Sequence, residues 1–562
     1  MIRISQLKLD VHHTEEELRA KICRLLRIRD EALLSCVQRK QSLDARKKPQ
    51  LFYVYTVDIK VKNENEIKKR IQKQKISNVQ FQPKEKKYML RASGTKPLAH
   101  RPVVIGTGPA GLFCGYELAR LGYRPILLER GAPVEERMKD VEDFWTTGVL
   151  KPDSNVQFGE GGAGTFSDGK LNTLVNDPSG RNARVLEIFV ENGAPEEILY
   201  QNKPHIGTDI LLKVVQNMRK YIISKGGEVR FYSKVTDLVI TKENGAGKLT
   251  ALRIDTQTNP RTNPDSKEIL DTEIAVLAIG HSARDTFAML RDLEIPMEAK
   301  SFAIGIRMEH PQAMIDRAQY GAERTSDLPA AAYKLTANLP NNRGVYTFCM
   351  CPGGYVVNAS SEAGRLAVNG MSYHARDGAN ANSAVVVTVT PKDCRTALKE
   401  KFCETADKSN ETEDVLSGME FQRRLEEAAY KAGNSRIPVQ LFKDFCKNRP
   451  SGGPGEIRPQ MKGGYTWGNV RSIFPEELAE ALEEGIRSFG KRLKGYDRPD
   501  ALVSGVESRT SSPVRILRDE TFQSCVKGLY PCGEGAGYAG GITSAAIDGL
   551  KTAEAVVTEY HA

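Results

Sequence analysis

The chain has 562 residues, of which 40% are hydrophobic and 27% are charged. This composition buries enough apolar surface for roughly two to four domains, so it excludes a mainly disordered protein. The longest apolar runs are strand-sized, well short of the roughly 20 residues that span a bilayer. With no secretory pattern at the N-terminus, we expect a cytoplasmic protein that does not enter the membrane. The ten cysteines form no Cys-x-x-Cys pair, which excludes a zinc ribbon or a disulfide scaffold.

The charge is concentrated at the front of the chain. Residues 1–100 hold 24 Lys and Arg against 11 Asp and Glu, a net of +13, so the rest of the chain has a net charge of −3. Thr14 and Glu17 form a capping-box pattern at the start of an apolar helix. A β-rich run at 52–59 and a polar helix at 65–73 follow. We therefore predict a basic α/β domain over residues 1–96, for which a ferredoxin-like arrangement is one candidate.

The remaining chain divides by its pattern of strands and helices. Strand and helix signals alternate over 97–300, become more strand-rich over 301–500, and end after 501 in a short strand, a glycine-rich turn and a helix. We expect an α/β protein with a Rossmann-like dinucleotide domain built from 97–300 and 501–562. An inserted α+β substrate domain would interrupt it at 301–500.

A dinucleotide fingerprint begins the second domain. A buried strand at 103–105 enters a turn with Gly106, Gly108 and Gly111, and a helix follows. These glycines permit a tight turn, close approach of a pyrophosphate and close helix–strand packing, respectively. The next strand ends at Glu129, 23 positions after Gly106, where a carboxylate can hold ribose hydroxyls. The ordered combination favours nucleotide binding over an ordinary glycine-rich turn.

Further glycine-dense segments indicate that the dinucleotide is FAD. They lie at 157–171 and 529–542, and an apolar strand ends in a small-residue turn at 278–282. An extended flavin dinucleotide needs close backbone approach at several separated points. No second GxGxxG motif with strand–helix context occurs, so NAD(P)H would visit the flavin only as a transient reductant. The predicted FAD contacts are Gly106, Gly108, Pro109, Ala110, Gly111, Glu129, Arg130, Gly161, Gly162, Ala163, Gly164, Gly280, Gly533, Glu534, Gly541 and Ile542.

On these motifs the chain resembles the glutathione-reductase-like class of FAD oxidoreductases. Within that class it is similar to a group of uncharacterised FAD-dependent dehydrogenases, which share the basic N-terminal domain and phrases such as those at 157–171 and 507–515. Ile279 stands where the class often has Thr, and Glu534 stands where it usually has Asp. The resemblance extends over essentially the whole chain and implies the fold and an FAD-dependent oxidoreductase, but no substrate.

Three residues are candidates for catalysis. Lys170 could place positive charge near the flavin ring, or it could be a solvent-facing loop lysine. Arg509 could clamp a substrate carboxylate bidentately, or it could pair with Glu507. His374 could act as a general acid or base in the inserted domain, although a structural histidine is the commoner case. Because Arg509 lies just ahead of the closing cofactor segment, we expect a small, anionic substrate.

The basic N-terminal domain suggests a second class of function. A positive domain could bind RNA or dock an acidic electron-carrier protein. No RNP or GXXG motif accompanies the charge, so a solvated charged face is favoured over nucleic-acid binding. A flavoenzyme acting on a small molecule therefore stands as the main hypothesis, and a flavoprotein with an RNA or protein partner is the alternative.

Overall fold

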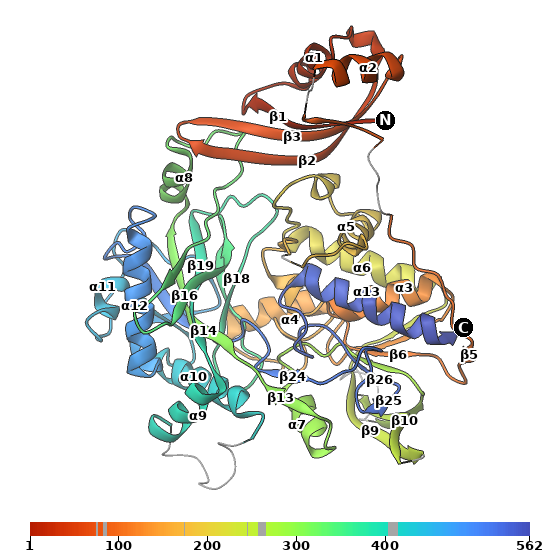
Figure 1. Ribbon diagram of the computed structural model, residues 1–562. Helices are drawn as coiled ribbons and strands as arrows, with labels where there is room; N and C mark the ends of the chain where they lie inside the picture. The colour runs from red at the N-terminus through yellow and green to blue at the C-terminus, as the bar shows by residue number, and fades with distance from the viewer. Residues whose placement is uncertain (75–76, 83–86, 174, 244, 257–265, 403–413) are drawn as a thin grey trace.

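The computed structural model describes residues 1–562 except 75–76, 83–86, 174, 244, 257–265 and 403–413. Figure 1 shows three parts: a small N-terminal domain at one end, a dinucleotide domain of parallel sheet and helices, and a cap domain built on a large antiparallel sheet. No helix among the described residues is both long and apolar enough to cross a membrane.

The N-terminal domain is a four-stranded antiparallel sheet with two helices. The strand order is β2-β3-β1-β4, which with the chain order β-α-β-β-α-β is the ferredoxin-like arrangement. Thr14 and Glu17 form the predicted capping box at the start of α1. The elements are β1 (Ile2–Asp10), α1 (Glu15–Leu26), β2 (Leu33–Lys47), β3 (Gln50–Val61), α2 (Glu64–Gln74) and β4 (Val79–Phe81).

The dinucleotide domain contains a five-stranded parallel sheet in the order β26-β12-β6-β7-β8. Strand β26 comes from the end of the chain and lies beside β12, so the closing segment returns to the sheet that carries the first fingerprint. Side chains alternate between the two faces of the sheet. The strands are β6 (Val103–Ile105), β7 (Ile126–Leu128), β8 (Glu228–Arg230), β12 (Ala275–Leu277) and β26 (Leu529–Pro531).

Each face of this sheet is covered by a separate buried cluster. Helices α3, α5, α6 and α13 pack on the face of Val104 and Val276. A three-stranded meander and α7 pack on the face of Val103 and Leu277. The covering elements are α3 (Pro109–Arg120), α5 (Arg181–Glu191), α6 (Thr208–Ser224), β9 (Ser233–Glu243), β10 (Ala246–Thr256), β11 (Ser266–Asp271), α7 (Arg284–Asp292) and α13 (Ile542–Glu559).

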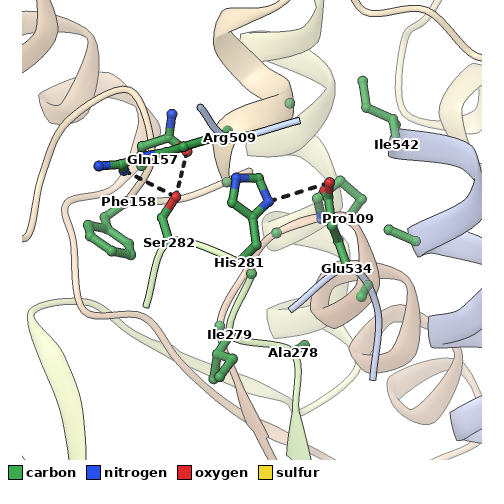
Figure 2. Close-up of a pocket in the computed structure, with 18 of the residues that line it drawn as sticks. Pro109, Gln157, Phe158, Ala278, Ile279, His281, Ser282, Arg509, Glu534 and Ile542 are labelled. Carbon is green, nitrogen blue, oxygen red and sulfur yellow. Dashed lines mark hydrogen bonds and ion pairs between the residues drawn. The ribbon is translucent and has the colours of Figure 1, made fainter. Parts of the chain in front are cut away.

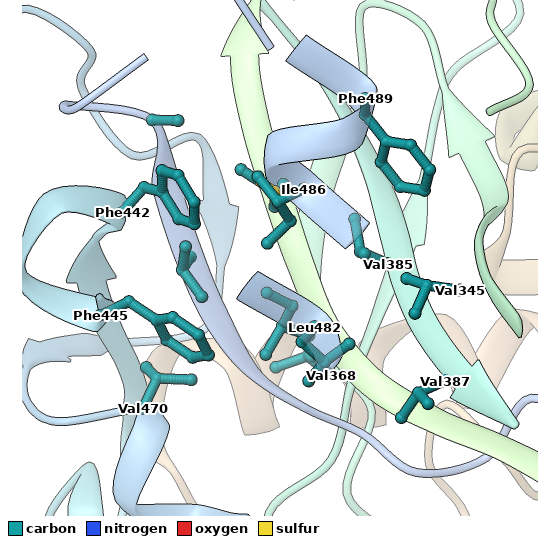
Figure 3. Close-up of a cluster of buried hydrophobic side chains, with 14 of the residues drawn as sticks. Val345, Val368, Val385, Val387, Phe442, Phe445, Val470, Leu482, Ile486 and Phe489 are labelled. Carbon is teal, nitrogen blue, oxygen red and sulfur yellow. The ribbon is translucent and has the colours of Figure 1, made fainter. Parts of the chain in front are cut away.

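The cap domain has a seven-stranded sheet in the order β15-β16-β19-β14-β23-β20-β22. Helix α12 packs its apolar face on this sheet, where Phe489, Ile486 and Leu482 meet Val345 and Val385 (Figure 3). The elements are β14 (Phe302–Pro311), α8 (Gln312–Tyr320), β15 (Thr336–Asn338), β16 (Gly344–Cys351), β19 (Asn380–Val389), α9 (Pro391–Glu400), α10 (Ser417–Ala432), β20 (Ile437–Leu441), α11 (Phe442–Phe445), β22 (Tyr465–Trp467), α12 (Glu476–Gly490) and β23 (Leu502–Glu507).

Strand β23 differs from the predicted boundary. The sequence placed residues from 501 onward in the dinucleotide domain, whereas β23 pairs with β14 and β20 inside the cap sheet. The cap therefore extends through Glu507, because strand pairing rather than local composition decides where the strand belongs. The smaller elements are α4 (Val134–Thr147), β13 (Met297–Ala299) with β24 (Val514–Ile516), β18 (Val368–Met371) with β17 (Tyr355–Asn358) and β21 (Met461–Lys462), β25 (Val526–Lys527), and β5 (Lys96–Pro97) with β27 (Tyr560–His561).

The N-terminal domain is docked on both other domains. Val11 and Leu51 belong to the buried core of the cap. The backbone N–H of Gln41, on the edge strand β2, donates to the Tyr200 carbonyl at 2.7 Å, and the Asn202 N–H donates to the Gln41 carbonyl at 2.9 Å. The domain is thus held to the dinucleotide domain by main-chain hydrogen bonds.

Candidate functional site

A cavity of about 330 Å³ lies between the dinucleotide domain and the cap. Figure 2 shows His281 between Glu534 on one side of the cavity and Arg509 on the other, and the cap contributes Phe348, Cys349, Asn369 and Glu507 to the lining. Fifteen predicted site residues line it: Gly106, Gly108, Pro109, Ala110, Glu129, Arg130, Gly162, Ala163, Gly164, Lys170, Gly280, Arg509, Glu534, Gly541 and Ile542.

Gly108, Gly280 and Gly541 leave room for a ligand. A Cβ on Gly108 would have only Gly162 Cα nearby, at 3.8 Å, and Cβ atoms on Gly280 or Gly541 would meet nothing within 4 Å. All four glycines line the cavity. The N-termini of α3 and α13 begin at Gly108 and Gly541, so free N–H groups and the positive ends of two helix dipoles face the same space. This arrangement suits a pyrophosphate.

Three predicted contacts do not line the cavity. A Cβ on Gly111 would lie 1.9 Å from the Gly106 carbonyl oxygen, and one on Gly533 would lie 2.6 Å from the Ala110 Cβ. Gly161 has a positive φ of 85°, and its N–H donates to the Thr107 carbonyl at 2.9 Å. These glycines are required for close packing of the walls rather than for contact with the ligand.

Glu129 connects the two glycine-rich loops. Its Oε2 accepts from the Thr107 N–H at 3.0 Å and the Thr107 hydroxyl at 2.7 Å, while its Oε1 accepts from the Gly131 and Gly159 N–H groups, each at 3.0 Å. A carboxylate has about four acceptor sites, so donors of the chain itself match all of them. The residue was predicted to hold a ribose; the structure gives it a further role in fixing the shape of the site.

Arg137, on α4, is a site residue that the sequence analysis missed. Its fully buried guanidinium donates to five carbonyl oxygens of the loop that follows α4. These belong to Asn155, Val156, Gly159, Glu160 and Gly162, at 2.7–3.3 Å. Burial lowers the pKa of Arg137 to about 10, which still leaves it charged at neutral pH. Its acceptors are main-chain carbonyl oxygens 18–25 positions further along the chain, and no side-chain pattern in the sequence marks them.

Arg130 lies at the nucleotide end of the cavity. Its guanidinium donates twice to the Asp285 carboxylate, each at 3.1 Å, and lies 4.4 Å from the centre of the Phe158 ring. The side chain is therefore already oriented by an ion pair and a cation–π contact. It forms a wall of the cavity, as does Phe158.

His281 and Glu534 face each other across the middle of the cavity. His281 Nδ1 lies 3.4 Å from Glu534 Oε1, and the ring is only 9% exposed (Figure 2). Its Nε2 is buried and has no hydrogen-bond partner among the described residues. A buried polar atom without a partner is unfavourable, so a ligand oxygen in the cavity is the natural acceptor or donor. The sequence analysis did not place His281 in the site.

Lys170 lies on the cap side of the cavity. Its Nζ contacts the Met350 carbonyl oxygen and lies 3.3 Å from Asp168 Oδ2. Burial opposes the charged amine, but Asp168 raises the pKa of Lys170 above its usual value. Arg376 also pairs with Asp168 through its Nε, at 3.0 Å, so two cations share one carboxylate. The group carries a net positive charge.

Arg509 lines the cavity but is engaged by the protein. Its Nε and Nη2 donate to the two oxygens of Glu426 at 2.9 and 2.8 Å, and its Nη1 donates to Ser361 and Ser282. The expected partner, Glu507, pairs instead with Arg307 at 2.9 Å. The guanidinium of Arg509 is thus not free to clamp a carboxylate as predicted, because Glu426 already fills its bidentate edge.

His374 does not line the cavity. Its ring stacks on His205 with the ring centres 5.2 Å apart, and its Nδ1 lies 2.9 Å from the Ile206 carbonyl oxygen. The structure therefore places it outside the site, and the predicted role as acid or base has no support from its position. The sequence predicted only that His374 belongs to the inserted domain, and the packing that turns its ring away from the cavity cannot be predicted from the sequence.

Comparison with known proteins identifies the family. The model of the FAD-dependent protein C-terminal domain matches residues 301–510, and a domain of unknown function, DUF8436, matches residues 1–60. An uncharacterised protein of Clostridium beijerinckii is 45% identical over 564 residues, covering 100% of this chain and 99% of that protein. The chain belongs to this family of FAD-dependent proteins. The family model thus agrees with the FAD dependence that the resemblance implied.

Solved structures give weaker likenesses to this FAD-dependent protein. The FrdA subunit of E. coli quinol fumarate reductase is 11% identical, covers 82% of this chain and 70% of its own, and has a TM-score of 0.33. A geranylgeranyl bacteriochlorophyll reductase-like protein of Thermoplasma acidophilum is 12% identical, with coverages of 81% and 77% and a TM-score of 0.31. These TM-scores are low, so the assignment rests on the family model and the full-length relative.

The residues of the cavity fit FAD. The open glycines 108, 280 and 541 provide space, and two helix N-termini provide donors for the pyrophosphate. His281, with its unpartnered Nε2, and Glu534 would hold polar groups of the middle of the cofactor. When bound, the flavin carries the electron transfer itself, and the protein supplies orientation and charge around it.

Proposed function

We propose that this FAD-dependent oxidoreductase acts on a small, anionic substrate at the cap side of the cavity. The observation that carries the proposal is the net positive group of Lys170, Arg376 and Asp168 at that wall. Phe348 and Asn369 of the cap also line this end and give it an apolar and a polar surface. A cation in a partly dehydrated wall favours an anion over a neutral molecule of the same shape.

The residue proposed to orient the substrate is Lys170 rather than Arg509. Lys170 lines the cavity, and its ammonium is positioned there by Asp168 and the Met350 carbonyl oxygen. Arg509 supports the wall through Glu426 and Ser361. With a single dinucleotide fingerprint in the chain, NAD(P)H is proposed only as a transient reductant that occupies the same space as the substrate in turn.

The test measures how small anions perturb the visible spectrum of the FAD-loaded protein. A panel of small carboxylates and phosphates is titrated beside the neutral amides and alcohols of the same size. We expect the anions to shift the flavin bands and the neutral molecules to leave them unchanged. Lys170→Met should weaken anion binding at least about tenfold, and Lys170→Arg should keep most of it.

Lys462→Met is the matched control. Lys462 is a cap lysine that lies over Tyr355, at 4.9 Å from the ring centre, and does not line the cavity. Its loss removes one positive charge at a position outside the cavity and should leave the anion response intact. An equal response to anions and neutral molecules, or equal effects of the two lysine variants, would contradict the proposal.

A further inference from the structure

Two cysteines at the end of β16 meet the cap side of the cavity, where electron transfer by the flavin alone would not require them. Cys349 is half-buried and lines the cavity, whereas Cys351 is fully buried behind it. The structure separates the two thiols: one faces the ligand space and the other lies within the wall.

The backbone directs Cys349 into the cavity. The pairing of β16 with β19 shifts register between Phe348 and Cys351, and Cys349 has a φ of +43°, in the left-handed region that residues with side chains rarely adopt. A bulge of this kind re-aims a side chain out of the regular strand pattern. The Cys351 Sγ lies 3.3 Å from the Cys349 carbonyl oxygen, so the two residues are in direct contact.

Two cations lie against the pair. Arg307 is fully buried, and its Nη1 lies 3.1 Å from the Cys349 carbonyl oxygen and 3.8 Å from the Cys351 Sγ. Lys170 contacts the carbonyl of Met350, the residue between the two cysteines. The carboxylates facing this group are Asp168, which pairs with Lys170, and Glu507, which pairs with Arg307.

These surroundings favour a thiolate on Cys349. The Cys351 thiol, followed by the cations of Lys170 and Arg307, holds the pKa of Cys349 well below its usual value. Burial raises the pKa of Cys351 well above its usual value. Cys532 also lines the cavity, but it is fully buried and burial raises its pKa too. A thiolate beside a thiol is the reactive form of a dithiol.

We propose that Cys349 and Cys351 are a redox-active dithiol that exchanges an electron pair with the flavin, and that small disulfides are the class of substrate it serves. The Cys349 thiolate attacks one sulfur of the substrate, the S–S bond of the substrate breaks, and one substrate thiolate leaves. Cys351 then passes its proton to the first substrate thiolate and attacks the Cys349 sulfur, which releases the second substrate thiolate and closes a Cys349–Cys351 disulfide.

The return step balances with the flavin chemistry. Reopening the internal disulfide to one thiolate and one thiol takes two electrons and one proton, which the reduced anionic flavin gives up on oxidation. A hydride donor of the nicotinamide class would restore the reduced flavin. The inference uses the FAD-binding family and the two cysteines, and does not depend on the substrate being an anion.

The deciding measurement is the number of reducing equivalents that the oxidised, FAD-loaded protein takes up. Anaerobic titration with dithionite, followed at the flavin bands and by thiol counting, should show wild type consuming about twice what one flavin takes. Cys349→Ser and Cys351→Ser should each consume only the two reducing equivalents that one flavin takes up. Cys525→Ser removes an exposed cysteine away from the cavity and should behave as wild type. If wild type consumes only the flavin's share, the proposal is overturned.

A second measurement needs neither flavin turnover nor substrate. Alkylation of the reduced protein by iodoacetamide across a pH series, read by peptide mass spectrometry, gives a midpoint for each cysteine. We expect Cys349 to react at least about tenfold faster than Cys525 near neutral pH. Lys170→Met should raise the Cys349 midpoint and Lys462→Met should not. Equal midpoints for Cys349 and Cys525 would overturn the assignment of a thiolate, whereas a missing anion response would affect only the proposed function.

Discussion

Arg509 and Glu426 form a bidentate ion pair in the wall of the cavity, with N–O distances of 2.9 and 2.8 Å. Arg284 holds the same carboxylate through two further hydrogen bonds at 2.9 and 2.8 Å. Burial alone would raise the pKa of Glu426, but Arg284 and Arg509 hold it well below its usual value. Glu426 lies on α10 of the cap, and Arg509 and Arg284, the latter on α7, lie in the dinucleotide domain. The two ion pairs therefore connect the two domains.

Glu426→Gln should destabilise the protein strongly. Removing the charge leaves the guanidinium of Arg509 buried without a counter-charge and leaves Arg284 with Glu362 as its remaining carboxylate, which costs about 3–5 kcal/mol in the free energy of unfolding. Urea denaturation of the two variants measures the effect. Glu427→Gln, the neighbouring residue whose pairs with Arg365 and Arg424 are partly exposed, should cost less than about 1 kcal/mol. Similar losses for both variants would contradict the role of the buried pair.

Gly108→Trp should abolish FAD binding and leave the fold intact. The Cβ of residue 108 points into open cavity space, so an indole ring would occupy the space of the pyrophosphate without displacing the wall. Gly452→Trp is the control, because Gly452 is exposed and also has nothing within 4 Å of a Cβ. The flavin released from each purified variant is measured by absorbance, and circular dichroism reports folding. A Gly108→Trp protein that still carries flavin would contradict the assignment of the FAD site to this cavity.

Local patterns predicted the fold of the two nucleotide segments well. The fingerprint at 103–111 and the strand at 529–531 follow rules of local geometry, and both lie where the parallel sheet needs them. The strand β2 was missed, because it is a long edge strand with many charged side chains and no alternating apolar face. The chain also breaks between β8 and β9 at Tyr232, which has a φ of +53°, and no local pattern marks this break.

The candidate site was predictable where backbone geometry forms it and not where distant side chains meet. Gly108 and Gly541 could be found because glycine is needed wherever a ligand approaches the main chain. The partners of Arg509 and Arg137 lie on other elements, and no spacing in the sequence connects Arg509 with Glu426. The direction of the Cys349 side chain could not be predicted, because it depends on a bulge in β16.

Arg137→Met should loosen the loop at 155–162. The substitution keeps much of the apolar stem but leaves five carbonyl oxygens without their donor, and each unsatisfied buried group costs about 1–3 kcal/mol. We expect weaker FAD binding, by at least about tenfold, and a lower melting temperature. Hydrogen exchange at 155–162 measures the local effect. Unchanged exchange in the loop would contradict the role of this guanidinium.

Gln41→Pro tests whether the N-terminal domain steadies the cavity wall. The Gln41 N–H bonds the Tyr200 carbonyl, and a few residues on, the Leu171 N–H bonds the Pro204 carbonyl at 3.0 Å, next to Lys170. Proline removes the donor of the first bond. Hydrogen exchange should rise at 200–206 and at 169–171. Gln41→Ala keeps the main-chain bonds and should show wild-type exchange; if both variants match wild type, the connection carries no effect.

Glu309 should give the stability of the protein a measurable dependence on pH. It is fully buried in the cap, and burial raises its pKa from 4.5 to about 7. The folded state therefore keeps the proton over a range in which the unfolded state has lost it. Below the pKa of the unfolded state both states are protonated, and the free energy of unfolding does not change with pH. Stability then falls as the pH rises toward the folded pKa, and the loss is complete above it.

The Glu309→Gln variant removes this titration. The fall in unfolding free energy between about pH 4 and about pH 8 should be smaller in the variant than in wild type, by about 2–3 kcal/mol. Urea denaturation at a series of pH values measures it. Glu160→Gln is a comparison at a second buried carboxyl, in the dinucleotide domain, whose pKa burial also raises to about 7. The buried Oε2 of Glu309 has no hydrogen-bond partner among the described residues, as a protonated carboxyl allows. If the unfolding free energy of Glu309→Gln depends on pH as that of wild type does, the Glu309 carboxyl does not titrate in this range and the prediction is wrong.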